Sequence, residues 1–249
     1  MTDSLGFRLK LGIIAPSTNT SVQPEMDAMR PYGVTNHHGR LYIPDSEIKG
    51  DDDFNRVMDN IRATMDEAAR VVMTCQPHRL VLGMSSETFW DGVDGSKKLL
   101  ARMHEISGGV PVSTGAEAVR VALGKYGSIR KIAVITPYMP PGDEQVRRFF
   151  TECGFELVAL KGLKGRSPVQ YAHVSERQLR DTINEINDPS IEAIVQVGTN
   201  LAMARLAGIA EFWLDKPVLA INTAIYWHAL RQSGISDRVP GFGSLLTDY

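Results

Sequence analysis

The sequence predicts an α/β fold of two similar halves, in which mainly parallel sheets face a central cleft. Short β-branched runs alternate with longer segments of helical period, as expected for successive βα units. Three pairs of segments also match between the halves, in the same order and at similar spacing. Polar residues directly follow the repeated strands, and this is where open parallel sheets bind their ligands.

Size and composition restrict the class of protein. The chain has 249 residues, of which 43% are hydrophobic and 22% charged, so it can bury a substantial core. The net charge is -2 without a long run of like charges, which argues against a nucleic-acid or anionic-membrane partner. No apolar run approaches the roughly 18 residues that span a bilayer, and the N-terminus lacks the apolar core of a signal peptide. We therefore expect a cytoplasmic protein.

The predicted elements follow from residue type and period. The helix over Asp51–Thr74 has the clearest apolar stripe and carries three aspartates at its positive end. Further helices are predicted over Val93–Ile106, Ala116–Tyr126, Gly142–Cys153, Ser175–Asn187, Ala202–Leu214 and Thr223–Ser233. Strands are predicted over Lys10–Ala15, Arg79–Gly83, Val110–Val112, Lys131–Thr136, Phe155–Leu160, Ile191–Val197 and Pro217–Ile221.

The internal repeat sets the domain organisation. Its matched pairs are Lys10–Pro16 with Lys131–Pro137, Leu80–Ser86 with Ile194–Asn200, and Val110–Leu123 with Lys216–Leu230. We expect two pseudo-symmetric, Rossmann-like halves, with residues 1–114 plus 222–249 in the first and residues 115–221 in the second. The paired loops that should line the cleft are Pro16–Thr20 and Pro137–Pro141, Met84–Thr88 and Gly198–Ala202, and Ser113–Gly115 and Ile221–Thr223.

The loop composition suits an anion. Hydroxyl and amide side chains beside backbone N–H groups can hold a carboxylate without a titrating cation. The alternative is local: Ser86 and Thr199 cap helices, while Ser17, Thr18 and Asn19 make turn hydrogen bonds.

Four segments in order resemble the aspartate/glutamate racemase superfamily over nearly the whole chain. Within that superfamily, the chain is most similar to the branch of maleate cis-trans isomerase and arylmalonate decarboxylase. The segments are Pro16–Thr20, Thr136–Met139, Val218–Trp227 and Pro240–Leu246. The resemblance implies an Asp/Glu racemase-like fold and a carboxylate site made by Asn19, Ser85, Ser86, Tyr138, Thr199 and Asn200.

The chain departs from this superfamily at the catalytic thiols. Its members generally place a cysteine after the second strand of one or both halves, and the matching positions here are Met84 and Gly198. The two cysteines of the chain, Cys75 and Cys153, fall near the ends of predicted helices and cannot replace them. They are also too few for a disulfide framework. The thiol mechanism therefore does not carry over.

Other residues must then supply the chemistry. Glu87, inside the Met84–Thr88 loop, is a candidate acid/base whose burial would raise its pKa, with Asp91 as a second carboxyl. The alternative for Glu87 is a capping role in a first helical turn. Tyr138 is a further catalytic candidate, and His173 follows a Gly/Ser-rich connection that could close over the cleft as a lid. No metal-ligand spacing or phosphate loop occurs, so we expect neither metal nor cofactor.

Together with these observations, the resemblance implies a cofactor-independent enzyme that acts on a small carboxylate metabolite through an enolate-like or oxyanionic intermediate. It would be an isomerase or a lyase (decarboxylase) without the catalytic cysteines. Two alternatives stay open: a hydrolase in which Glu87 activates water, and a non-catalytic carboxylate-binding protein. An apolar helix face would favour a homo-oligomer.

Overall fold

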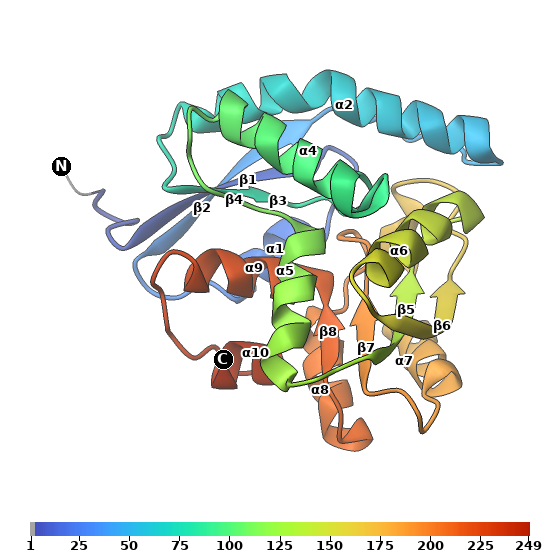
Figure 1. The fold of residues 1–249 in the computed structure, drawn as a ribbon. Helices are drawn as coiled ribbons and strands as arrows, with labels where there is room; N and C mark the ends of the chain where they lie inside the picture. The colour runs from blue at the N-terminus through green and yellow to red at the C-terminus, as the bar shows by residue number, and fades with distance from the viewer. Residues whose placement is uncertain (1–2) are drawn as a thin grey trace.

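Two parallel sheets of four strands form the framework of the protein in a computed structural model that describes residues 3–249. The strand order is β2-β1-β3-β4 in the first sheet and β6-β5-β7-β8 in the second (Figure 1). The same order recurs in both halves, and this confirms the predicted two-half α/β fold. The strands are β1 (Leu9–Pro16), β2 (Val34–Leu41), β3 (Arg79–Leu82), β4 (Val112–Ser113), β5 (Lys131–Thr136), β6 (Glu156–Gly162), β7 (Ala193–Gln196) and β8 (Val218–Ala220).

The helices follow the strands as successive βα units. Before β5 they are α1 (Val22–Ala28), α2 (Asp51–Met73), α3 (Ser86–Phe89), α4 (Gly92–Ile106) and α5 (Gly115–Leu123), with the 3-10 helix η1 (Gly124–Tyr126). After β5 they are α6 (Pro140–Glu152), the 3-10 helix η2 (Gln170–His173), α7 (Glu176–Ile186), α8 (Ala204–Leu214), α9 (Ile221–Arg231) and α10 (Ser244–Asp248).

The sequence analysis places β1, β5 and α2 within one or two residues, but it misses β2. This strand reads VTNHHGRL, and only its two ends are apolar and buried. It lies at the edge of the sheet and pairs with β1 from Val34 to Leu41. Its centre is half-buried, so it lacks the apolar run from which a strand is predicted. The short helices α1, α3 and α10 are also missed.

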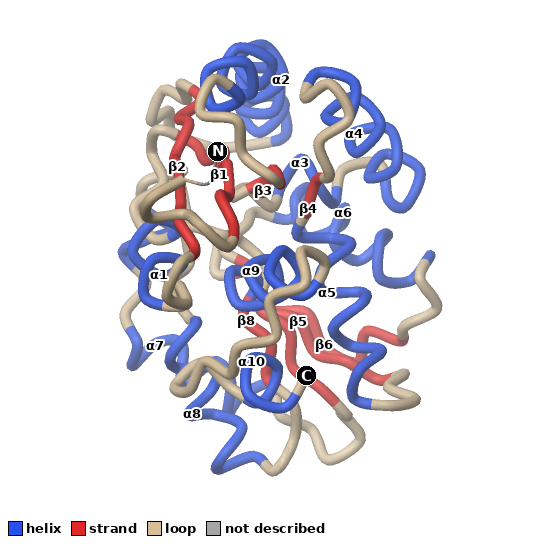
Figure 2. Tube along the Cα trace, turned by 90° about the vertical axis from the view of Figure 1, so that its left-hand side faces the viewer, coloured by secondary structure: helices blue, strands red, loops and turns tan. Residues whose placement is uncertain are grey.

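Helix α9 joins the two halves. It is buried from Ile221 to Leu230, and it packs on α5, on α1 and on the strands β3 and β4 of the first sheet. Figure 2 shows it between the two sheets. A helix that is buried on nearly every side needs contacts all round, and the space between the halves provides them.

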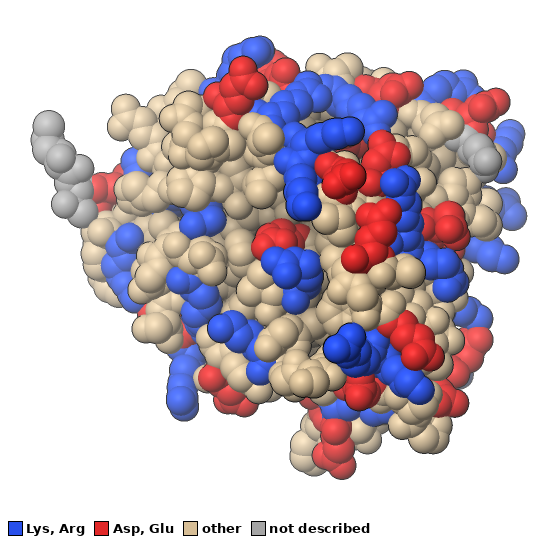
Figure 3. All heavy atoms as spheres, in the orientation of Figure 1, with Lys and Arg blue, Asp and Glu red and all other residues tan. Residues whose placement is uncertain are grey.

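The surface charge and the lengths of the helices are relevant to nucleic-acid and membrane partners. On the face shown in Figure 3, basic and acidic side chains are interspersed without a broad patch of one sign. None of the helices within residues 3–249 combines the length and the hydrophobicity needed to cross a bilayer.

A carboxylate also ties the halves together. Glu25 of α1 accepts hydrogen bonds from the backbone N–H of Ala204 (2.8 Å) and from the Nδ2 atom of Asn222 (2.7 Å). Asn222 donates in addition to the carbonyl oxygen of Thr199 at 2.9 Å. Burial raises the pKa of the Glu25 carboxyl, and these hydrogen bonds oppose that shift. Glu25 thereby links α1 to the start of α8, to α9 and to a loop of the second half.

Removing this carboxylate should loosen the junction. We expect Glu25→Ala to lower the free energy of unfolding by about 2 kcal/mol, because two donors at the junction lose their acceptor. Urea denaturation followed by circular dichroism measures this change. The matched control is Glu67→Ala on the exposed face of α2, which should change stability by less than about 0.5 kcal/mol. Equal effects of the two substitutions would contradict the role of Glu25.

Candidate active site

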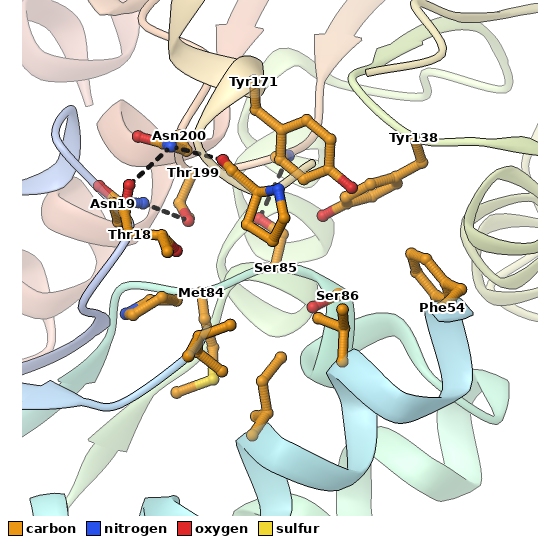
Figure 4. Close-up of a pocket in the computed structure, with 16 residues that line it drawn as sticks. Thr18, Asn19, Phe54, Met84, Ser85, Ser86, Tyr138, Tyr171, Thr199 and Asn200 are labelled. Atoms are coloured by element: carbon orange, nitrogen blue, oxygen red, sulfur yellow. Dashed lines mark hydrogen bonds between the residues drawn. The ribbon is translucent and has the colours of Figure 1, made fainter. Parts of the chain in front are cut away.

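A pocket lies between the halves, at the carboxyl ends of β1, β3, β5 and β7 (Figure 4). One side of it is apolar and is formed mainly by α2. The apolar lining consists of Ile43, Phe54, Val57, Ile61 and Met84, and the polar lining consists of Thr18, Asn19, Ser85, Ser86, Tyr138, Tyr171, Thr199 and Asn200. We call this pocket the cleft. All six residues of the expected carboxylate site, namely Asn19, Ser85, Ser86, Tyr138, Thr199 and Asn200, lie in it.

The loop after β7 is fastened to the first half. The backbone N–H of Gly198 donates to Ser85 Oγ at 3.2 Å, and Thr199 Oγ1 donates to the carbonyl of Gly83 at 3.1 Å. Asn19 Nδ2 donates to Thr199 Oγ1 at 3.2 Å. Polar residues after β1, β3 and β7 therefore meet at one place, as expected for paired parallel sheets.

Asn200 connects three loops. Its Oδ1 atom accepts the N–H of Thr20 at 2.8 Å. Its Nδ2 atom donates to the carbonyls of Thr18 (3.3 Å) and Pro168 (2.9 Å). Asn200 thus holds the loop after β1 and the connection before η2 around the polar side of the cleft.

Asn19 combines the two roles weighed from the sequence. Its Oδ1 atom accepts the backbone N–H groups of Ser21 (3.0 Å) and Val22 (2.9 Å), which fixes the start of α1. Its Nδ2 atom meanwhile reaches across to the second half at Thr199. Local capping and a place in the cleft are compatible here, because the amide has a donor end and an acceptor end.

The two positions that the resemblance assigns to thiols have different surroundings. Met84 is buried in the apolar lining. Gly198 has φ +103°, and a Cβ atom there would collide with the ring of Pro137. The backbone at 198 therefore favours glycine, and a side chain would require Pro137 to move.

The cysteines of the chain lie elsewhere. Cys75 follows α2 and Cys153 follows α6, and both are half-buried. Burial raises the pKa of each thiol, which reduces its thiolate fraction at neutral pH. Within residues 3–249, neither cysteine lines the cleft.

Two phenols lie on the polar side of the cleft. Tyr138 is positioned by its backbone N–H, which donates to Thr136 Oγ1 at 3.1 Å, and its ring lies edge-on to Phe54 and Tyr171. Burial raises the pKa of both phenols. The sequence analysis does not select Tyr171. The one signal for it was its position two residues before His173, in the connection considered as a lid.

Glu87 lies outside the set of residues that lines the cleft. Its Oε1 atom accepts a hydrogen bond from Arg62 Nε at 2.9 Å, and the Arg62 guanidinium lies 5.7 Å from the centre of the Trp90 ring. These three residues line a neighbouring hollow. Burial raises the pKa of Glu87, as expected from the sequence, and the pairing with Arg62 opposes the shift. Asp91 has an exposed side chain just before α4.

His173 is exposed at the end of η2 and does not line the cleft. The structure therefore brings Tyr138 together with the expected carboxylate site, but not Glu87 or His173.

Among the described residues that line the cleft, the only ionisable side chains are the phenols of Tyr138 and Tyr171. Across residues 3–249, no cluster of three or more His, Cys, Asp or Glu side chains is arranged to bind a metal.

A carboxyl lies behind the two phenols. Asp143 of α6 accepts a hydrogen bond from Thr136 Oγ1, and burial raises its pKa to about 6. When it is ionised, its negative charge adds to the rise in the pKa of Tyr138 and Tyr171. Asp143 therefore influences the cleft without lining it.

Comparisons with known proteins agree with this architecture. The family model for arylmalonate decarboxylase matches residues 11–246. The maleate isomerase of Alcaligenes faecalis is 24% identical over 251 residues, which cover 96% of each chain. The maleate isomerase of Geobacillus stearothermophilus is also 24% identical, over 260 residues that cover 96% of this chain and 97% of that protein.

Two solved structures share the fold. Maleate cis-trans isomerase of Nocardia farcinica, a cysteine-to-serine mutant with a covalently bound succinylcysteine intermediate, has a TM-score of 0.87 at 20% identity. The match covers 97% of this chain and 99% of that one. A crystal structure of arylmalonate decarboxylase has a TM-score of 0.77 at 21% identity, and the match covers 95% of this chain and 98% of that one.

The pKa of Asp143 leads to a prediction about stability. Because the folded-state pKa is raised to about 6 from 3.8, the folded state binds the proton more tightly than the unfolded state. The free energy of unfolding should therefore fall as the pH rises through the window from about 4 to 6. Asp143→Asn keeps an acceptor for the Thr136 hydroxyl and removes this decrease in the free energy of unfolding with pH. We expect the variant to exceed the wild type by about 1 kcal/mol at pH 8, after allowance for solvent screening, and by nothing at pH 4. Urea denaturation at both pH values measures this, and a variant that gains nothing at pH 8 would contradict it.

Proposed function

The chain belongs to the arylmalonate decarboxylase family, and from this premise we propose that it is a cofactor-independent lyase that decarboxylates a small, substituted dicarboxylate. The relatives named as maleate isomerases and arylmalonate decarboxylases support an isomerase or a lyase that acts on a small carboxylate. The observation that favours the lyase is the ionisable content of the cleft, which is limited to two neutral phenols among the described residues.

Isomerisation and decarboxylation make different demands on a site. The Nocardia farcinica relative is named with a succinylcysteine intermediate, which needs a thiol in contact with the substrate. Cys75 and Cys153 lie away from the cleft here, so the covalent route has no nucleophile of that kind. Proton abstraction from carbon would need a base, and phenols whose pKa is raised stay protonated at neutral pH and cannot accept that proton.

Decarboxylation needs neither nucleophile nor base. The bond between the α-carbon and one carboxylate breaks, CO2 leaves, and the electron pair stays on the α-carbon. The remaining carboxylate delocalises this pair as an enolate, whose oxygens carry the developing charge. The reaction ends when an acid returns one proton to the α-carbon, so that the net change is the uptake of one proton and the release of CO2.

The two sides of the cleft suit these steps. Hydroxyl donors in the cleft, including Ser85 and Ser86, can stabilise an enolate oxygen as neutral dipoles that are already in place. Phe54 and Val57 on the opposite side would accept the apolar substituent and destabilise the charged carboxylate that leaves. Neutral CO2 is favoured over a carboxylate in such surroundings.

A substrate comparison tests this function. We expect release of CO2 from a 2-aryl malonate and no conversion of maleate to fumarate. Asn19→Asp should raise KM by about tenfold or more, because it places a negative charge beside the bound carboxylate while its oxygen still accepts the N–H groups of α1. Asn184→Asp, on an exposed face of α7, is the matched control and should leave KM unchanged.

Three outcomes would contradict the proposal. Formation of fumarate from maleate would indicate an isomerase. Hydrolysis of an enamide or cyclic carboxylate without loss of CO2 would indicate a hydrolase. Thermal stabilisation by dicarboxylates without turnover of any of these compounds would indicate a binding protein.

The position of Glu87 yields a separate prediction. Under this proposal its carboxylate supports the contact of α3 with α2 through Arg62. Glu87→Gln keeps an acceptor for Arg62 Nε, so we expect the turnover rate to stay within about threefold of the wild type. Glu144→Gln on the exposed face of α6 is the control. If a folded Glu87→Gln protein instead turned over substrate slower by about two orders of magnitude, Glu87 would be identified as an acid/base.

A further inference from the structure

We propose that Tyr171 is the general acid that delivers the proton to the α-carbon after CO2 has left. This inference rests on the decarboxylation proposed above and names the residue that completes it. It is carried by the placement of Tyr171 in the cleft, by its contact with Tyr138 and by its partial exposure to solvent.

The backbone around Tyr171 is held from several directions. In the connection before η2, the N–H of Lys164 donates to the carbonyl of Tyr138 (3.1 Å) and the N–H of Gly165 donates to that of Pro137 (2.9 Å). The N–H of Val169 donates to Asp45 Oδ1 at 3.1 Å. Anchoring of this kind fixes the direction of the phenol, as a proton donor requires.

Close packing also restricts the Tyr171 ring. A Cβ atom at Gly165 would overlap with this ring, so the connection passes against it only because residue 165 is glycine. On another side, the ring meets that of Tyr138 edge-on, with 5.8 Å between the centroids. Figure 4 shows both side chains at the polar side of the cleft, opposite Phe54 and Met84.

The two phenols have different partners. Tyr138 is buried and lines the cleft together with Ser85, whose Oγ accepts the N–H of Gly198. Tyr138 therefore lies among the groups that would hold the carboxylate. Tyr171 is half-buried and lies between the cleft and the surface, so its oxygen can exchange protons with water between turnovers.

The acid strength of Tyr171 suits a group that donates a proton to the carbanion but does not take a proton from the product. Burial, followed by the charge of Asp143, raises the pKa of its phenol, so it is protonated at neutral pH. A carbanion left by CO2 is a far stronger base than a phenolate and takes the proton. The O–H bond of Tyr171 breaks as the new C–H bond forms, and the phenolate then takes a proton from water. The hydroxyls of Ser86 and Thr18 are weaker acids and compete poorly.

Tyr171→Phe is the direct test, because it removes one oxygen and keeps the ring. With a prochiral 2-aryl-2-methyl malonate, we expect the wild type to form one enantiomer, since a fixed donor protonates one face of the enolate. The variant should turn over about 100-fold more slowly with KM within about threefold, and its residual product should be racemic, because water reaches either face. The exposed Tyr32→Phe is the matched control and should change none of these values.

The product distinguishes this role from a structural one. A folded Tyr171→Phe protein that still forms a single enantiomer at the wild-type rate would overturn the assignment to Tyr171 while leaving the lyase intact. Absence of CO2 release from the wild type would instead overturn the proposed function itself.

A second measurement applies if Tyr171→Phe does not fold. Gly165→Ala keeps the phenol, but the added Cβ atom would overlap with the Tyr171 ring and must displace it. We expect this variant to release CO2 more slowly and to form a product that is no longer a single enantiomer. A folded Gly165→Ala protein that forms a single enantiomer at the wild-type rate would overturn the proposal.

Discussion

The hydrogen bonds between the Gly198–Asn200 loop and the first half hold the cleft together. Gly198 and Thr199 bond to the loop after β3, while Asn200 bonds to the loop after β1 and to the connection before η2. Glu25 reaches the same loop through Asn222. Because the two sheets are separate, these contacts and the buried helix α9 determine how the polar ends of the strands face one another. A shift of either sheet would separate the donors that form the polar side of the cleft.

The same arrangement limits the chemistry. Many of the polar groups that meet at the junction are amides, hydroxyls and backbone N–H groups, and these hold an anion without titrating. The described cleft residues that do titrate are phenols, and their surroundings keep them protonated. A site of this kind can stabilise negative charge and give up a proton. It is poorly suited to taking a proton from carbon, so the charge on carbon must come from breaking a bond within the substrate.

The sequence predicted the features that depend on local pattern. The apolar runs of β1 and β5 and the stripe of α2 were correct because burial on one or both faces leaves a clear period. The polar loops were found together in space because parallel strands of repeated halves end at the same edge. Strand β2 was missed because an edge strand needs few apolar residues, and VTNHHGRL has them only at its ends.

The direction of individual side chains was beyond pattern reasoning. Ser86 and Glu87 are adjacent in sequence, but on α3 successive side chains turn by about 100°, so Ser86 lines the cleft while Glu87 meets Arg62. His173 was chosen because it follows the Gly/Ser-rich connection considered as a lid, whereas the structure brings Tyr171 of the same short helix into the cleft. The most direct test for a base in the cleft follows hydrogen exchange at the α-carbon of the reaction product. In D2O, a substituted malonate without an α-hydrogen should yield a monocarboxylate with one deuterium on the α-carbon, and a single enantiomer of that product, added back, should neither exchange nor racemise. Exchange or racemisation of the added product would contradict a cleft that donates protons but does not abstract them.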